Sequence, residues 1–153
     1  MGGGCSGFKK PVPMIVADLC NSTTDLIAKA KKLVEAPEVG VKEVADFVKS
    51  LAGFVDVVCD LLESLDQGNS SRDLVKKVAD LTSKVAGLPE GVPLTKNQVL
   101  EVIVSSLEVV KGSLKVASDF CSEYKAQLDI AIKALDEVIK ELKKQLPPEP
   151  TKE

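Results

Sequence analysis

From Thr95 to Leu146 the sequence is TKNQVLEVIVSSLEVVKGSLKVASDFCSEYKAQLDIAIKALDEVIKELKKQL. Apolar side chains recur in this stretch every three or four residues, as on one face of an α-helix, and they do not alternate as in a strand. The apolar positions are Leu100, Ile103, Leu107, Val110, Leu114, Ala117, Phe120, Tyr124, Leu128, Ile132, Leu135, Val138, Ile139 and Leu142. The stretch therefore predicts helix throughout, opened by a capping box in which Thr95 and Gln98 each satisfy a free amide.

A single helix over this stretch would be about 78 Å long at 1.5 Å per residue. The earlier apolar segments are much shorter, so half of such a rod would have no helix to cover its stripe. We therefore expect a break between Ser118 and Ala126, with Gly112 as the alternative position. The stripe that follows the break should pack in the core; the alternative is a surface that binds an unidentified protein partner.

Three further helices are expected before this stretch. The first begins after Pro13 and is ended by Pro37, because proline cannot continue a helix. The second runs from Val39 or Val41 to Asp66, with Gly68 as its left-handed C-terminal residue. The third is capped by hydroxyl side chains within Asn69–Asp73 and ends at Gly87. The core positions expected in the second and third helices are Val44, Phe47, Val48, Leu51, Phe54, Val55, Val58, Leu62, Leu65, Leu74, Val75, Val78, Leu81 and Val85.

The predicted fold class is all-α, an up-and-down antiparallel bundle of five amphipathic helices, with four as the alternative count. The length of 153 residues suits one domain. We divide the chain into a flexible Gly-rich leader at 1–12, the helical bundle at 13–146 and a disordered Pro-rich tail at 147–153.

The composition argues against catalysis and against nucleic-acid binding. The chain has no histidine, the commonest general base and metal ligand, and its net charge of −3 provides no basic face. Four Phe, one Tyr and no Trp leave an aliphatic interior. We expect a protein that is not an enzyme and that holds no metal or cofactor.

The N-terminal residues Met1-Gly2-Gly3-Gly4-Cys5-Ser6 resemble the pattern that N-myristoyltransferase recognises. The resemblance implies a myristoyl chain on Gly2 once Met1 is removed. Cys5 stands where dually acylated proteins often carry palmitate, and a single myristoyl chain binds a bilayer only marginally. Lys9 and Lys10 follow at a distance suited to anionic headgroups. The alternative is a plain flexible leader.

Four cysteines, Cys5, Cys20, Cys59 and Cys121, have no CxxC spacing. An antiparallel hairpin about Pro37 brings Cys20 and Cys59 to one level, and the other two cysteines should lie at the same end of the bundle. Three states remain open: disulfides Cys20–Cys59 and Cys5–Cys121, free thiols that behave as small apolar groups, or a four-thiolate metal site.

Two hypotheses for function follow from these patterns. The first is a dually acylated adaptor or scaffold on the cytoplasmic face of a membrane. The second is a secreted, disulfide-tied bundle that shelters lipid or another apolar ligand between its helices, or acts as a surface-active or structural protein. In the secreted case Asn21 and Asn69, each followed by the Asn-X-Ser/Thr pattern, would be glycosylation sites.

Overall fold

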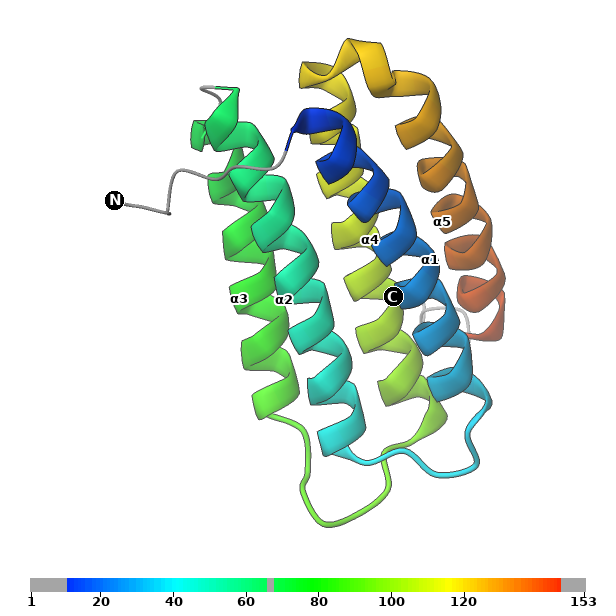
Figure 1. Ribbon diagram of the computed structural model, residues 1–153. Coiled ribbons are helices and arrows are strands. Elements are labelled where there is room, and N and C mark those ends of the chain that lie inside the picture. The colour runs from blue at the N-terminus through cyan, green and yellow to red at the C-terminus, as the bar shows by residue number, and fades with distance from the viewer. Residues whose placement is uncertain (1–10, 66–67, 147–153) are drawn as a thin grey trace, which may run out of the picture.

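A computed structural model describes residues 11–65 and 68–146 (Figure 1). Within them the chain forms five α-helices, two short 3-10 helices and no strand, which confirms the all-α bundle. The α-helices are α1 (Val12–Glu35), α2 (Val41–Ser64), α3 (Arg72–Ala86), α4 (Lys96–Phe120) and α5 (Lys125–Gln145). Successive helices run in opposite directions, so α1 and α5 run the same way along the bundle (Figure 1).

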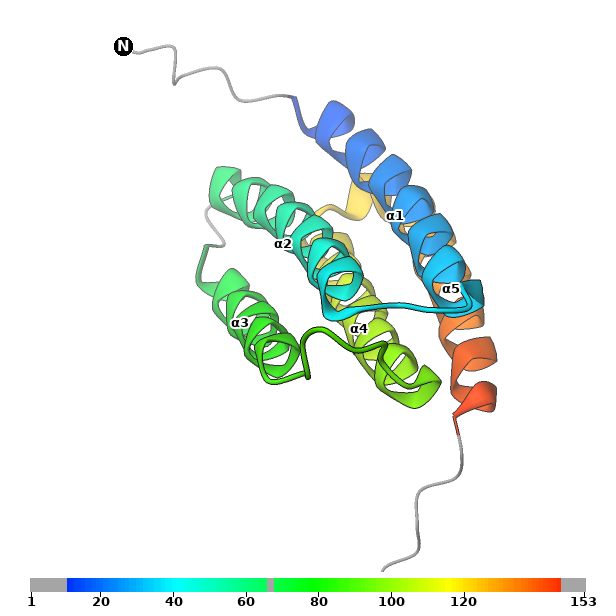
Figure 2. The same cartoon turned by 90° about the horizontal axis from the view of Figure 1, so that it is seen from below.

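The helix α4 occupies the centre of the bundle and packs against each of the other four α-helices. In the view along the bundle, α3 lies on one side of the α2–α4 pair, and α1 and α5 lie on the other (Figure 2). The helices α1 and α5 also pack directly against each other. Two helices that are far apart in sequence thus share one outer face of the molecule.

The first helix begins and ends at prolines. Pro11 precedes its first residue, and Pro13 lies in the first turn, where the missing N–H has no helical partner to lose. Helix α1 therefore starts at Val12, one residue earlier than the predicted bundle boundary. Ala36 is extended, with ψ of 139°, because Pro37 disfavours the helical conformation in the residue before it.

The connection between α2 and α3 differs from the prediction. Helix α2 ends at Ser64 rather than Asp66, and Gly68 belongs to a 3-10 helix, Gly68–Ser71, that leads into α3. Ser71 is the residue before α3, but its backbone is helical and its side chain makes no cap hydrogen bond. The predicted hydroxyl cap is wrong here because the chain is already coiled when it enters α3.

The predicted break in the long apolar stretch is confirmed at its first position. Helix α4 ends at Phe120, and Cys121 leaves helical geometry with φ of −125° and ψ of 63°. A 3-10 helix, Ser122–Tyr124, then turns the chain into α5. Gly112 lies inside α4. The turn lets α5 fold back on α4, so each half of the stripe covers the other.

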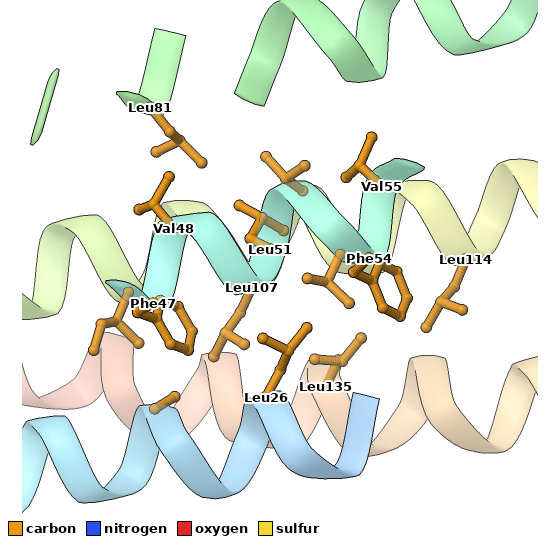
Figure 3. Close-up of a cluster of buried hydrophobic side chains, with 14 of the residues drawn as sticks. Leu26, Phe47, Val48, Leu51, Phe54, Val55, Leu81, Leu107, Leu114 and Leu135 are labelled. Atoms are coloured by element: carbon orange, nitrogen blue, oxygen red, sulfur yellow. The ribbon is translucent and has the colours of Figure 1, made fainter. Parts of the chain in front are cut away.

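The core is mainly aliphatic, with Phe47 and Phe54 also buried in it, and it is continuous across all five helices. Leu51 of α2 and Leu107 of α4 are fully buried, and both lie among the side chains that fill the space between α2, α4 and α5 (Figure 3). The buried hydroxyls of Ser106 and Ser113 donate to carbonyls one turn back, at 2.8 Å in each case. Among the described residues no buried side-chain N or O lacks a hydrogen-bond partner.

Two residues of the predicted core are exposed. Val75 is 51% exposed because α3 packs mainly on α2 and α4 and buries Leu74, Leu81 and Val85 there. Phe120 is 39% exposed because α4 ends there and the chain turns away.

An apolar groove between α1 and α5

A hollow without charged residues in its lining lies between α1 and α5, with a volume of about 460 Å³. We call it the α1–α5 groove. It is lined by Pro13, Ala17, Cys20, Asn21, Thr23, Thr24 and Ile27 of α1, and by Tyr124, Gln127, Ile130, Ala131 and Ala134 at the start of α5. None of these side chains is charged, whereas each of the other three hollows described has charged residues in its lining.

Small side chains on both helices account for the groove. Ala17 of α1 and Ala131 and Ala134 of α5 contribute only a methyl group each to the lining. Larger apolar residues at these positions would fill the space by packing across the two helices, as they do elsewhere in the core. The helices therefore touch along their inner faces and leave a furrow on the outside.

Two of the polar side chains in the groove wall are hydrogen-bonded within α1. The Thr23 hydroxyl donates to the Leu19 carbonyl at 2.8 Å, and the Thr24 hydroxyl donates to the Cys20 carbonyl at 3.3 Å. These bonds stay inside α1 and leave the two threonine side chains with no need of a ligand to satisfy their hydroxyls. The chemistry offered to a ligand along this wall is therefore mainly apolar.

Cys20 lies in the groove as a free, half-buried thiol. Its Sγ is 3.8 Å from the main-chain oxygen of Gln127 on α5, within the range of a weak S–H hydrogen bond. Burial raises the pKa of the Cys20 thiol above its ordinary value, so the neutral thiol is the form present at neutral pH. A neutral thiol contributes a small apolar surface to the groove.

Ile130 is the most exposed large apolar residue in the lining of the groove. Its side chain is 71% exposed, the largest value among the exposed large hydrophobic residues of the described chain. An exposed isoleucine on a helix that otherwise buries its apolar face leaves surface that a bound apolar group would remove from water.

The three cysteines that the structure describes, Cys20, Cys59 and Cys121, are free, which agrees with the free-thiol alternative and not with a Cys20–Cys59 disulfide. The antiparallel hairpin about Pro37 predicted that these cysteines lie at one end of the bundle. It could not predict the direction in which each side chain points. Cys20 is directed to α5 through its contact with Gln127, whereas the Cys59 thiol is hydrogen-bonded to Ser71 beside α3. Cys5, the expected partner of Cys121, lies outside the described residues.

Of the remaining predicted site residues, the structure describes Asn21 and Asn69. Gly2 lies outside the described residues, as does Cys5. Asn21 is exposed on α1 and lines the groove, while Asn69 is exposed in the 3-10 helix before α3. No group of three or more His, Cys, Asp or Glu side chains in residues 11–65 and 68–146 is arranged to hold a metal ion.

Two charged side chains of α5, Asp136 and Lys143, are paired with α4. Asp136 accepts from Lys111 of α4 at 2.7 Å and pairs with Lys140 at 3.2 Å, and Lys143 lies 3.0 Å from Glu108 of α4. The apolar stripe of α5 is buried at Ala131, Leu135, Ile139 and Leu142. This stripe therefore seals the bundle, in agreement with its predicted place in the core.

Sequence reasoning did not find the groove. Periodicity locates the buried stripe of each helix, but Ala17, Gln127 and Ala134 lie beside those stripes. The sequence feature that could have indicated the groove is the presence of alanines on both helices. It indicates a groove only when α1 and α5 are known to be neighbours. The arrangement suits an elongated, uncharged, apolar ligand.

No α-helix in the described part of the chain has the length and apolar character needed to cross a bilayer. Comparison of the chain with known protein families, with curated proteins and with solved structures yields no match.

Proposed function

We propose that this protein is a non-enzymatic helical bundle held at the cytoplasmic face of a membrane by acyl chains on Gly2 and Cys5, where it serves as an adaptor or scaffold. The observation that carries the proposal is the sequence Met1–Ser6 followed by Lys9 and Lys10, immediately before α1. A short leader of this kind would keep the bundle close to its anchor.

The chemistry of the first anchor requires a free glycine amine. After Met1 is removed, the Gly2 amine attacks the thioester carbonyl of a myristoyl-coenzyme A, an amide forms and the coenzyme A thiol leaves. Each buried methylene contributes roughly 0.8 kcal/mol to membrane binding, yet one myristoyl chain alone gives only reversible attachment. A palmitoyl chain on Cys5 would supply the second anchor, and Lys9 and Lys10 would add attraction to anionic lipid.

A second candidate function is the sheltering of an apolar ligand, and the α1–α5 groove is the observation that favours it. In its secreted form this candidate also relied on disulfides and on glycosylation of Asn21 and Asn69. The free thiols of Cys20, Cys59 and Cys121 remove the first of these supports. The ligand-binding part of the candidate stands on the groove alone.

The test is fractionation of cells that express the wild type, Gly2→Ala and Gly7→Ala. Alanine at position 2 should abolish acylation and move the protein from membranes to the soluble fraction. Gly7→Ala, which removes a glycine outside the acceptor pattern, should leave the protein on membranes. Equal membrane fractions of wild type and Gly2→Ala would exclude the adaptor proposal.

The two anchors can be separated by Cys5→Ser. This variant keeps the acceptor amine of Gly2 but has no thiol for palmitate, so it should bind membranes weakly and reversibly. Intact mass of each purified protein identifies the chains attached, because each acyl group adds its own mass to the protein.

A further inference from the structure

We propose that the α1–α5 groove is a binding site for a saturated acyl chain, and that its occupant is the chain carried by Gly2 of the same molecule. The inference rests on the proposed acylation of Gly2. When the protein is away from a membrane the acyl chain lies in the groove, and at a bilayer it leaves the groove and inserts.

The chemistry of the groove matches a methylene chain. An acyl chain brings no charge and few hydrogen-bonding groups, so it favours a wall that has no charged side chain and is mainly apolar. The hydroxyls of Thr23 and Thr24 are bonded within α1, and none of the lining side chains is charged. An amphipathic protein partner would instead be expected to meet charged residues at the rim.

The size of the groove is also appropriate. Its volume of about 460 Å³ falls within the roughly 300–1,000 Å³ of typical small-molecule sites. Its lining extends along α1 from Pro13 to Ile27, a rise of about 21 Å at 1.5 Å per residue. The site is therefore elongated along the helix axis, as a single extended acyl chain requires.

The position of the groove selects the attached chain over a free fatty acid. The leader joins the bundle at Pro11, and Pro13 is already part of the groove lining. The residues between Gly2 and Pro11 can span at most about 30 Å, so an acyl group on Gly2 reaches any point along the groove. A connection this short gives an effective concentration of roughly millimolar order.

A chain bound in the groove would reduce the exposure of two side chains. A chain in the groove would cover Ile130, whose side chain is otherwise 71% exposed. It would also cover the thiol of Cys20, which lines the same groove. Cys59 is a free thiol of similar intermediate exposure on α2, outside the groove. The reactivity of Cys20 therefore reports whether the groove is occupied, and the reactivity of Cys59 is the internal control.

The acylated chain can be prepared without any transferase. The thioester of myristoyl-Gly-Gly-Gly is ligated to a chain that begins at Cys5, which regenerates the complete sequence from Gly2 to Glu153. The acetyl-Gly-Gly-Gly thioester gives the matched unacylated protein. Failure of cells to acylate Gly2 would therefore count against the proposed function without affecting this test.

The readout is the alkylation rate of each cysteine in the two ligated proteins, resolved by peptide mass spectrometry. Cys20 should react about tenfold or more slowly in the myristoylated protein, as expected for a site that must open before it reacts. Cys59 should react at the same rate in both. Phosphatidylcholine vesicles should restore the rate at Cys20, because the bilayer competes for the chain.

Equal rates at Cys20 in the two proteins, or an equal slowing of Cys20 and Cys59, would overturn the proposal. Free myristate offers a further comparison. If it protects Cys20 in the acetylated protein while the attached chain does not, the groove takes its ligand from solution and the intramolecular assignment is wrong.

A pair of surface variants tests the location of the chain. Ile130→Asn removes apolar surface from the groove, and Val75→Asn removes a 51% exposed valine from α3, away from it. Protection of Cys20 in the myristoylated protein should fall severalfold with Ile130→Asn and stay unchanged with Val75→Asn. Protection that survives Ile130→Asn intact would place the chain elsewhere and overturn the assignment.

Discussion

The Nζ of Lys111 on α4 lies 2.7 Å from Oδ1 of Asp136 on α5, while Lys140 approaches the other carboxylate oxygen at 3.2 Å. Hydrogen bonds from the two ammonium groups, that of Lys111 first, hold the pKa of the Asp136 carboxyl below its ordinary value near 3.8. Because the folded-state pKa is depressed, the stabilisation is present above pH 3.8 and is lost as the pH falls through the lower folded-state value.

Asp136→Asn should therefore reduce the free energy of unfolding at pH 7, and by less at pH 2, because the stabilisation declines as the pH falls toward the lowered pKa of the Asp136 carboxyl. Urea unfolding at the two pH values measures the difference. Glu137→Gln, at a neighbouring exposed carboxylate, is the control and should change little at either pH. A side-chain NMR titration of Asp136 with a midpoint at or above 3.8 would contradict the assignment.

Thr95 and Gln98 form the capping box that begins α4. The backbone N–H of Gln98 donates to the Thr95 hydroxyl at 3.1 Å, and the backbone N–H of Thr95 donates to the Gln98 side-chain oxygen at 2.9 Å. Thr95→Ala should lower the free energy of unfolding by about 1 kcal/mol, with a range of roughly 0.5–2. Thr82→Ala removes an exposed hydroxyl bonded within α3 and should cost less. Chemical denaturation measures the free energy of unfolding of both variants. Equal losses would mean that the capping hydrogen bonds stabilise the protein no more than the Thr82 hydroxyl does.

The thiols of Cys20, Cys59 and Cys121 should behave as weakly reactive, unpaired groups. Burial raises the pKa of each, and at Cys59 the carboxylates of Asp56, Asp60 and Glu63 raise it further against a lowering hydrogen bond from Ser71. Their alkylation rates in the unacylated protein should still be rising at pH 9, because the reactive thiolate forms only at higher pH. A rate that levels off well below pH 9 would contradict this, as would a Cys20–Cys59 disulfide in non-reduced peptide maps.

The sequence was sufficient to predict the helices because burial and helical periodicity agree along most of the chain. The proline-free stretch from Thr95 had to break, since an unbroken rod has no partner for half its stripe, and Cys121 is where it does. The connection before α3 was not predictable in the same way. The segment from Asn69 has the residue types of a cap, yet the preceding 3-10 helix changes the backbone that a cap requires.

The candidate site depends on information that the sequence does not contain locally. Helix α1 neighbours α5 only because α4 is central and the chain folds back at Cys121. From the sequence alone, Ala17 and Ala134 are ordinary helix formers. The sequence also gives no reason to place Cys20 beside α5 and not beside Cys59. The same arrangement bears on the Cys20–Cys59 disulfide, one of the three states that the sequence left open. Cys20 contacts Gln127 of α5, and both thiols are free.

Leu107 tests the packing of the core because α4 is its central helix. The side chain is fully buried and lies near Leu51, Leu26 and Leu135 from three other helices (Figure 3). Leu107→Ala should lower the free energy of unfolding by roughly 2–5 kcal/mol, the cost of a cavity that an aliphatic core only partly closes. Val75→Ala, at a valine that is 51% exposed, should change it by less than about 0.5 kcal/mol. Thermal or urea unfolding followed by circular dichroism measures both. A loss below 0.5 kcal/mol at Leu107, as roughly expected of a surface position, would mean that the face of α4 assigned to the core is exposed in solution.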